Sequence, residues 1–219
     1  MQRHAVQMDI AIGRAAAVAV AIETIVFGLS LVLGLVVRSN LGPKIGYVVC
    51  ILLAASVVVM MAAVYLRTPA ELRILGLLAL VAAILYAPFC IGNYFLQISI
   101  VAANPLDHPT EVMKLLAFVP GSPTFALDML GYAFLCLSTL AAAFILSDPR
   151  DKALRILCFV HGALAVPTIA APIVSGILRS SGSQANDAGS WILLFWCALF
   201  TPIAILFAGW FRRYMGGLK

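Results

Sequence analysis

Residues 51–64 read ILLAASVVVMMAAV, and this stretch has no charged residue and a single hydroxyl, that of Ser56. Its apolar residues do not alternate with polar ones, as they would along a strand of a membrane β-barrel. The run lies within a longer apolar stretch, residues 44–66. A helix of about 20 apolar residues can cross the roughly 30 Å hydrocarbon core of a bilayer. The stretch therefore predicts a transmembrane helix.

The rest of the chain repeats this pattern. Of its 219 residues, 63% are hydrophobic and 11% are charged, a composition that excludes an ordinary soluble domain. The first apolar stretch is too long for a signal-peptide core and has no cleavage pattern after it, so we expect it to be retained. We expect one integral membrane domain over residues 1–219, an all-α polytopic bundle with six transmembrane helices at 15–37, 44–66, 74–101, 125–146, 154–178 and 190–211.

The basic residues gather in alternate connections between these stretches. Cytoplasmic segments of membrane proteins are enriched in Lys and Arg, so this bias predicts both termini in the cytoplasm. The opposite side would then hold four basic residues: Arg38, Lys44, Lys114 and Arg179. The cytoplasmic side would hold ten: Arg3, Arg14, Arg67, Arg73, Arg150, Lys152, Arg155, Arg212, Arg213 and Lys219. Because these residues sit at helix ends rather than in one patch, we expect the bilayer, and no nucleic acid, as their partner.

The connection between the third and fourth spans is the longest, at residues 102–124. The stretch from Asp107 to Glu111 indicates a helix start with acidic residues in its first turn. We expect a short helix over residues 111–119, too short to span, lying in the interface or against the bundle. Ser122 is the expected N-cap of the fourth span, with Pro123 at its first helical position. This segment is equally consistent with a functional lid and with a structural one.

Polar side chains at membrane depth should turn toward protein or trapped water, so they indicate which face of each helix is interior. On the third span they recur at three- and four-residue steps, at Tyr86, Cys90, Asn93 and Gln97. Four other spans carry a comparable stripe. The residues of these stripes are His161, Thr168, Pro172 and Ser175 on the fifth span; Glu23, Phe27, Ser30 and Gly34 on the first span; Asp128, Tyr132 and Thr139 on the fourth span; and Cys197, Thr201, Ala204 and Ala208 on the sixth span. The second span has no comparable stripe, which predicts a position at the periphery, against lipid.

These polar residues fall at two depths. Counting helical rise from the span ends places Glu23 and His161 at an inner level and Asp128, Tyr132, Asn93 and Gln97 at an outer level. An acidic side chain as deep as Glu23 needs a partner or a proton. We expect either a proton or cation site with His161 as its relay partner, or a carboxyl that ties helices together.

The other polar residues also leave alternatives open. His161 alone is typical of a satisfied interior histidine. Asp128 lies within two turns of a helix N-terminus, where the helix dipole favours an acid, so structural anchoring competes with a binding role. Asn93 and Gln97 either line a solute path or bridge helices. Pro88 and the prolines of the fifth span predict broken or kinked helices.

The sequence contains none of the common catalytic motifs that we considered. The chain has no His-Glu-x-x-His, no Gly-x-Ser-x-Gly and no glycine-rich phosphate loop. Its three histidines are spread so that they do not predict a metal site. The five cysteines fall one in each of spans two to six, without disulfide spacing, which predicts packing residues. The sequence thus leans away from an enzyme, assigns no catalytic residue and implies no particular cofactor.

One stretch resembles a known group of proteins. The residues from Tyr94 to Gln97, followed after the loop by Ala126-Leu127-Asp128-Met129-Leu130-Gly131-Tyr132, are similar to a family of uncharacterised bacterial six-helix integral membrane proteins. In that family a Leu-Gln helix end, a variable loop and an Ala-Leu-Asp-x-x-Gly-Tyr helix recur. The resemblance covers about residues 86–165. It implies a bacterial inner-membrane protein and draws attention to Gln97, Asp128 and Tyr132, but it implies no activity.

Together these features favour a small bacterial inner-membrane protein that binds or transports a small solute or ion. The expected binding residues are Glu23, Asn93, Gln97, Asp128, Tyr132, His161 and Thr168. The alternative is a non-catalytic subunit or sensor of a larger membrane complex, whose polar residues only hold helices together. In that case we expect a membrane-protein partner or a homo-oligomer.

Overall fold

A computed structural model of the protein describes residues 2–103, 110–178 and 184–216. Within these ranges the chain is helical and has no strand. Six segments are long and apolar enough to cross a membrane: Val6–Leu35, Leu41–Arg67, Ala70–Val101, Pro123–Ile145, Pro149–Val174 and Gly189–Tyr214. The predicted all-α membrane bundle is therefore confirmed for the described part of the chain.

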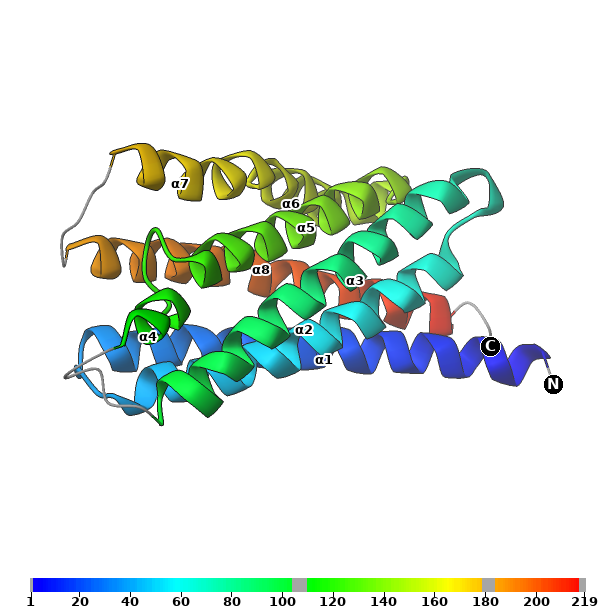
Figure 1. The fold of residues 1–219 in the computed structure, drawn as a ribbon. Coiled ribbons are helices and arrows are strands. Elements are labelled where there is room, and N and C mark those ends of the chain that lie inside the picture. The colour runs from blue at the N-terminus through cyan, green and yellow to red at the C-terminus, as the bar shows by residue number, and fades with distance from the viewer. Residues whose placement is uncertain (1, 104–109, 179–183, 217–219) are drawn as a thin grey trace.

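Eight α-helices and three short helical segments make up the described residues. In chain order they are α1 (Gln2–Leu35), α2 (Leu41–Arg67), the 3₁₀ helix η1 (Ala70–Leu72), α3 (Arg73–Leu96), the π-helical segment η2 (Gln97–Val101), α4 (Glu111–Leu116), α5 (Pro123–Ile145), the 3₁₀ turn η3 (Pro149–Asp151), α6 (Lys152–Ala163), α7 (Ala165–Leu178) and α8 (Gln184–Gly216). Consecutive spanning helices run antiparallel (Figure 1).

The connections alternate between two ends of the bundle. Both termini, the α2–α3 connection and the α5–α6 connection lie at one end, which we call the termini end; the α1–α2 connection and α4 lie at the other, the α4 end (Figure 1). The basic side chains at the start or end of helices, such as Arg67, Arg150 and Arg213, share the termini end, whereas Arg38 and Lys44 belong to the α4 end. The side chains of Arg3, Lys114, Arg179 and Lys219 lie outside the described residues.

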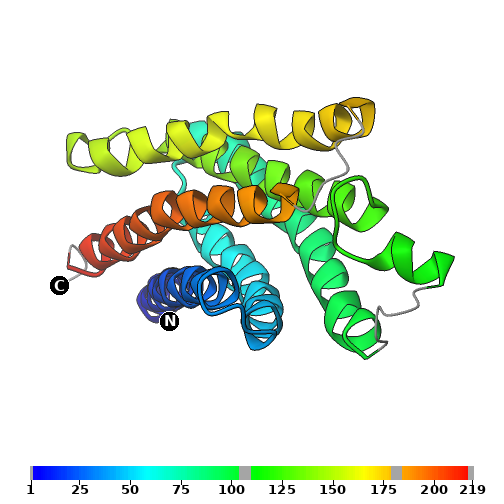
Figure 2. The ribbon, with the colours of Figure 1, turned by 90° about the vertical axis from the view of Figure 1, so that its left-hand side faces the viewer.

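The packing order of the helices is not their order in the chain. α1 packs against α2 and α8, α3 against α2 and α5, and α5 against α6 and α7. Seen from the α4 end, α8 lies between α1 and the α6–α7 pair (Figure 2). The inward face of α8 supplies three of the largest fully buried side chains, Phe200, Phe207 and Phe211. The core therefore runs along this face of α8, which packs closely against α1 and also contacts α6.

The expected peripheral position of the second span is wrong. Half of the apolar window of α2 is buried, a larger share than in α1 or α3, and Leu53, Val57 and Met60 are fully buried. α2 lies between α1 and α3 and contacts both. Its interior face is made of apolar side chains, so it has no polar stripe to distinguish it from a lipid-facing surface.

The first and fifth spans also differ from the expected boundaries. α1 starts at Gln2 rather than near residue 15 because the residues before Arg14 contain no helix-breaking proline. The fifth span is divided at Leu164, whose N–H bonds the carbonyl of His161 at 3.1 Å in a tighter turn. Pro167 has no N–H to donate to the carbonyl of Ala163, so the α-helical pattern stops there. Pro88 and Pro172, in contrast, lie inside continuous helices.

The long connection between α3 and α5 is largely as expected. Thr110 caps α4 by accepting a hydrogen bond from the N–H of Met113 at 3.3 Å. Ser122 caps α5 by accepting one from the N–H of Phe125 at 3.1 Å, and Pro123 follows as the first helical residue. α4 ends at Leu116, shorter than the expected 111–119. Residues 107–109, part of the expected helix start, lie outside the described residues.

Small residues let α1 and α2 approach closely near the α4 end. A Cβ placed on Gly42 would lie 2.6 Å from the carbonyl oxygen of Ser30 and 2.7 Å from the backbone nitrogen of Gly34. Backbone atoms cannot yield in the way that the end of a flexible side chain can. Ser30 and Gly34 therefore form a close helix–helix contact with Gly42, of the kind common in membranes.

We predict that Gly42→Ala separates α1 from α2 and destabilises the protein by about 1–3 kcal/mol, the usual range for overpacking. Gly92→Ala is the matched control, because nothing beyond the adjacent residues and the backbone of its own helix lies within 4 Å of the added Cβ. Thermal unfolding of both variants in detergent checks this. Equal melting temperatures for Gly42→Ala and Gly92→Ala would contradict the close contact.

Candidate functional site

A cleft of about 790 Å³ lies at the α4 end, between α1, α2, the start of α8, the end of α3 and the residue segment after α4. Its walls include the aromatic side chains of Phe27, Tyr47, Tyr94 and Phe118. Polar groups and a cation, among them Ser30, Arg38, Asn40 and Ser190, contribute to the same lining. An apolar body with a few polar groups is the usual composition of a small-molecule site.

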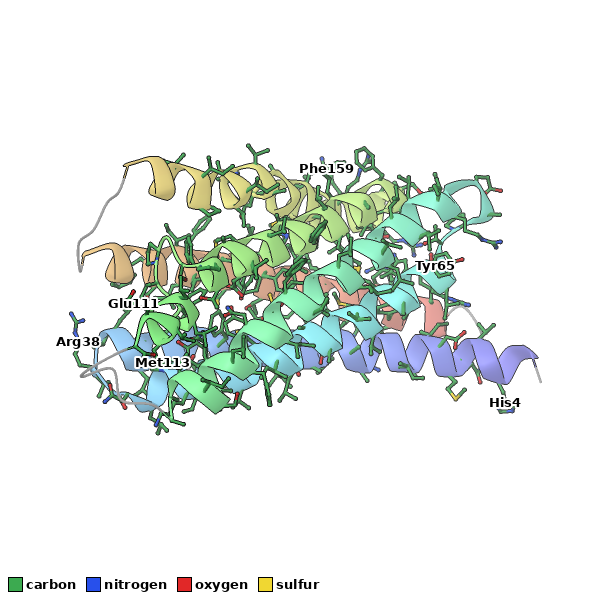
Figure 3. All side chains as sticks on the ribbon, in the orientation of Figure 1. His4, Arg38, Tyr65, Glu111, Met113 and Phe159 are labelled. Atoms are coloured by element: carbon green, nitrogen blue, oxygen red, sulfur yellow. The ribbon has the colours of Figure 1, made fainter. Side chains whose placement is uncertain are left out.

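Arg38 lies where the chain leaves α1. Its backbone φ is +55°, the left-handed conformation that favours glycine. This conformation lets the N–H of Ser39 reach back to the carbonyl of Leu33, at 3.4 Å, and end the helix. Figure 3 shows Arg38 at the α4 end, the end at which Glu111 and Met113 also lie. A charged residue thus occupies a strained position at the cleft.

Aromatic contacts hold the cleft wall together. The rings of Tyr47 and Tyr94 stack with centroids 5.6 Å apart. The ring of Phe118 lies 6.4 Å from that of Tyr94 and 5.7 Å from that of Phe125. These contacts join α2, α3, α5 and the segment after α4, so the wall is built from parts that are distant in the sequence.

The hydroxyl of Tyr94 connects the cleft to a buried carboxyl. It donates a hydrogen bond to Oδ2 of Asp128 at 3.1 Å and lies 3.2 Å from the hydroxyl of Tyr132. Asp128 is 1% exposed, and its Oδ1 has no hydrogen-bond partner among the described residues. We call Tyr94, Asp128 and Tyr132 the Asp128 cluster.

Asn93 lies beside this cluster. It is buried, and its side-chain nitrogen, like Oδ1 of Asp128, is buried without a hydrogen-bond partner among the described residues. A buried amide that donates no bond is unfavourable, because the group has lost water and gained nothing in return. The Asn93 amide lies within reach of the carboxyl of Asp128, so this donor and this acceptor are available to each other as well as to a bound water or proton.

The four residues of the outer polar level expected from the sequence therefore divide into two groups: three lie in or beside the Asp128 cluster, and Gln97 has a structural role. Asp128 and Tyr132 hydrogen-bond through Tyr94, with Asn93 adjacent in α3. Gln97 instead holds the segment after α4: its Nε2 donates to the carbonyl of Leu116 at 2.7 Å, and its Oε1 accepts from the N–H of Phe118 at 3.3 Å. Gln97 therefore positions the cleft wall rather than lining a path.

Tyr94 is the residue that sequence reasoning missed. It follows Cys90 by four residues and precedes Gln97 by three, so it lies on the same helical face as the stripe already identified. The stripe was drawn through the neighbouring Asn93 instead. The helical spacing was therefore sufficient to find Tyr94. It was overlooked because Asn93 and Tyr94 are adjacent, are both polar and lie on the same broad face of the helix.

The inner polar level does not form the expected relay. Oε1 of Glu23 accepts a hydrogen bond from the hydroxyl of Ser56, on α2, at 3.0 Å. Its Oε2 has no hydrogen-bond partner among the described residues. Glu23 remains half-buried, whereas His161 is fully buried and bonds to other residues. The structure places these two residues in separate contacts.

His161 is a satisfied interior histidine. The indole N–H of Trp196 can only donate, and it lies 2.9 Å from Nε2, which must therefore be the unprotonated nitrogen. Nδ1 then bears the proton and donates to the hydroxyl of Thr139 at 2.7 Å. Thr139 in turn donates to the carbonyl of Cys136 at 2.9 Å. Both ring nitrogens are used, so this neutral imidazole joins α5, α6 and α8.

The remaining expected residue of the fifth span has a local role. The hydroxyl of Thr168 donates to the carbonyl of Leu164 at 2.6 Å, at the break between α6 and α7. It is not part of the cleft lining or of the Asp128 cluster. The side chain of Ser175, on the same predicted stripe, lies outside the described residues.

The chemistry available at the cleft is hydrogen bonding and proton exchange. In the part of the chain that the structure describes, no three His, Cys, Asp or Glu side chains are placed to hold a metal ion. The five cysteines are buried free thiols, which confirms their predicted packing role.

Comparison with family models, with curated proteins and with solved structures found no match to this chain.

We predict that Trp196→Phe destabilises the protein by about 1–3 kcal/mol, because it leaves Nε2 of His161 buried without a donor. The phenyl ring keeps the stacking position against Phe200, whose centroid lies 4.9 Å away. Trp191→Phe on the same helix is the control, since Trp191 is 60% exposed. Thermal unfolding separates the two, and a loss of stability shared equally by both variants would rule out the bond to His161 as its cause.

Proposed function

We propose that this protein binds a small amphiphilic solute in the cleft at the α4 end, and that binding is coupled to the Asp128 cluster. The proposal places the chain in a bacterial inner membrane with both termini in the cytoplasm, as the bias of basic residues favours. The cleft then opens toward the outside of the cell. Membership of the bacterial six-helix family that residues 86–165 resemble remains a prediction of the same kind.

The lining of the cleft supports this class of ligand. Tyr47, Tyr94 and Phe118 offer flat apolar surfaces, while Ser30, Asn40 and Ser190 offer hydrogen bonds. Arg38 adds a permanent positive charge at an exposed position. A solute with an apolar or aromatic body and a polar or anionic end matches these groups better than a simple metal ion, which would need several converging oxygen ligands.

The coupling to Asp128 rests on Tyr94, which belongs both to the cleft lining and to the Asp128 cluster. Tyr94 lines the cleft, and its hydroxyl also donates to Asp128. A ligand group that accepts a hydrogen bond from Tyr94 would take that bond away from Asp128. The carboxyl, already without a partner at Oδ1 among the described residues, then favours its protonated form, because an unpaired charge is unfavourable in a buried site. This shared hydroxyl is the observation on which the proposal depends.

Transport is the extension of this binding role. Apolar side chains between the cleft and the termini end, such as Met60, Met61 and Phe207, are fully buried, so close packing separates the cleft from that end in the described form. Opening toward the other end would require helices to move. The break at Leu164 and the π-helical end of α3 are the points at which regular helix structure is already interrupted.

A second candidate, a membrane subunit or sensor, is favoured by Glu23. This half-buried carboxyl has one oxygen without a partner among the described residues and lies deep in the first span. This oxygen is buried, so a polar or cationic side chain from a neighbouring membrane protein or a second copy would supply the missing bond once the carboxyl turns toward the surface of the bundle. Purification in mild detergent distinguishes the candidates: a stable larger complex favours the subunit, and stabilisation of the isolated protein by a solute favours binding.

We predict that a panel of small amphiphilic solutes, screened by thermal shift on the detergent-solubilised protein, contains members that raise its melting temperature. Tyr94→Phe should lower their affinity at least about tenfold, the effect of losing one buried hydrogen bond to a charged or polar group. Tyr65→Phe is the control, since Tyr65 lies toward the termini end (Figure 3). Equal affinities for the two variants, or no stabilising solute at all, would refute the proposal.

We further predict that Arg38→Gly leaves the melting temperature of the free protein unchanged or raises it, because glycine adopts a φ of +55° without strain. The same substitution should weaken the binding of anionic solutes more than that of neutral ones. Affinities from the thermal-shift series for both solute classes test this. A parallel loss for the two classes would show that Arg38 acts through structure and not through charge.

A further inference from the structure

A second cavity lies at the opposite end of the bundle. It has a volume of about 510 Å³ and is lined by side chains of α1, the end of α2, the η3 turn and the end of α8. Three of these are arginines from different elements, Arg67, Arg150 and Arg213, and we call the cavity the arginine pocket. Two aspartates, Asp148 and Asp151, also line it, so the lining has a net positive charge.

Two of the arginines are paired with these aspartates. Arg150 and Asp148 form a two-point contact at the surface, with nitrogen–oxygen distances of 2.6–3.1 Å. The hydrogen bonds from Arg150 hold the pKa of Asp148 down to about 2, so this aspartate stays ionised. Arg213 pairs with the buried Asp151. These pairs fix the two arginines at the edge of the pocket.

Arg67 is the third arginine and is only loosely paired. Its nearest acid, Asp9 on α1, lies 3.9 Å from its terminal nitrogen, at the limit of an ion pair. Its Nε is buried and has no hydrogen-bond partner among the described residues. A guanidinium has five N–H donors in a rigid fork, so Arg67 presents unused donors at the pocket.

Aromatic side chains form the apolar part of the wall. Trp210 is 3% exposed, and its ring packs against that of Tyr214 with centroids 4.8 Å apart. Tryptophan and tyrosine at the end of a spanning helix mark the depth of the lipid headgroups. The pocket therefore lies where phosphate groups of the bilayer are found, with a cation directed at it.

We propose that the arginine pocket binds a phosphate group, with Arg67 as the residue that contacts it. Guanidinium matches the geometry of phosphate oxygens through two parallel N–H bonds, and basic pockets between spanning helices are a known way to hold anionic headgroups. The phosphate could come from an anionic phospholipid of the adjacent leaflet or from a soluble phosphate compound. The two sources share the same contacts and differ in how they reach the pocket.

The test uses the full-length protein in phosphatidylcholine nanodiscs, with and without phosphatidylglycerol, and separately with millimolar inorganic phosphate. We expect the protein to retain about fivefold more phosphatidylglycerol than its share of the lipid, the effect of one well-placed cation. Arg67→Gln should bring this ratio to one. Arg73→Gln is the matched control, because Arg73 is exposed at the same end and outside the pocket.

Each outcome decides the proposal. Lipid preference lost in Arg67→Gln and kept in Arg73→Gln supports a headgroup site; stabilisation by inorganic phosphate with the same pattern supports a soluble ligand. If the wild type and Arg67→Gln behave alike toward both anions, the proposal is overturned. Should Arg67→Gln fail to fold, Arg67→Lys replaces it, because an ammonium keeps the charge but cannot form the two parallel N–H bonds of a guanidinium. An unchanged preference in Arg67→Lys would also overturn the assigned contact.

Discussion

A polar side chain within the hydrocarbon is unfavourable unless it finds a partner inside the protein, because lipid offers none. Most hydroxyls in this bundle meet that requirement locally: Thr24, Ser30 and Thr68 each bond a carbonyl of their own helix. Few polar contacts therefore remain to join one helix to another. The bonds of Ser138 to Ala79, of His161 to Thr139 and Trp196, and of Tyr94 to Asp128 fix the relative positions of α3, α5, α6 and α8.

This constraint explains how much of the fold the sequence could predict. Hydropathy and helix length gave six spans, and the capping residues Ser122 and Pro123 gave the start of α5 to within two residues, because these signals are local. The central position of α2 was not predictable, since Leu53, Val57 and Met60 would look the same facing lipid. The N-terminal boundary of α1 was not predictable either, because a helix can continue past the membrane where no residue ends it.

The candidate site shows the same division between local and spatial information. Depth along each helix correctly grouped Asp128 with Tyr132, and Tyr94 joins them. Depth alone also grouped Glu23 with His161, yet they bond to Ser56 and to Thr139 with Trp196. Depth fixes the level of a side chain but not the direction in which it points around the helix axis. The partner of a buried group depends on which helices are neighbours, and that order differs from the order in the chain.

The division of the fifth span at Leu164 has a mechanical consequence. On one side of it, His161 anchors α6 to α5 and α8; on the other, α7 exposes Val166 and Ile173 and packs mainly against α5. The two halves can therefore tilt independently. A thinner or thicker bilayer would be accommodated by the inclination of α7, as hydrophobic mismatch requires, while the imidazole and its neighbours keep their geometry.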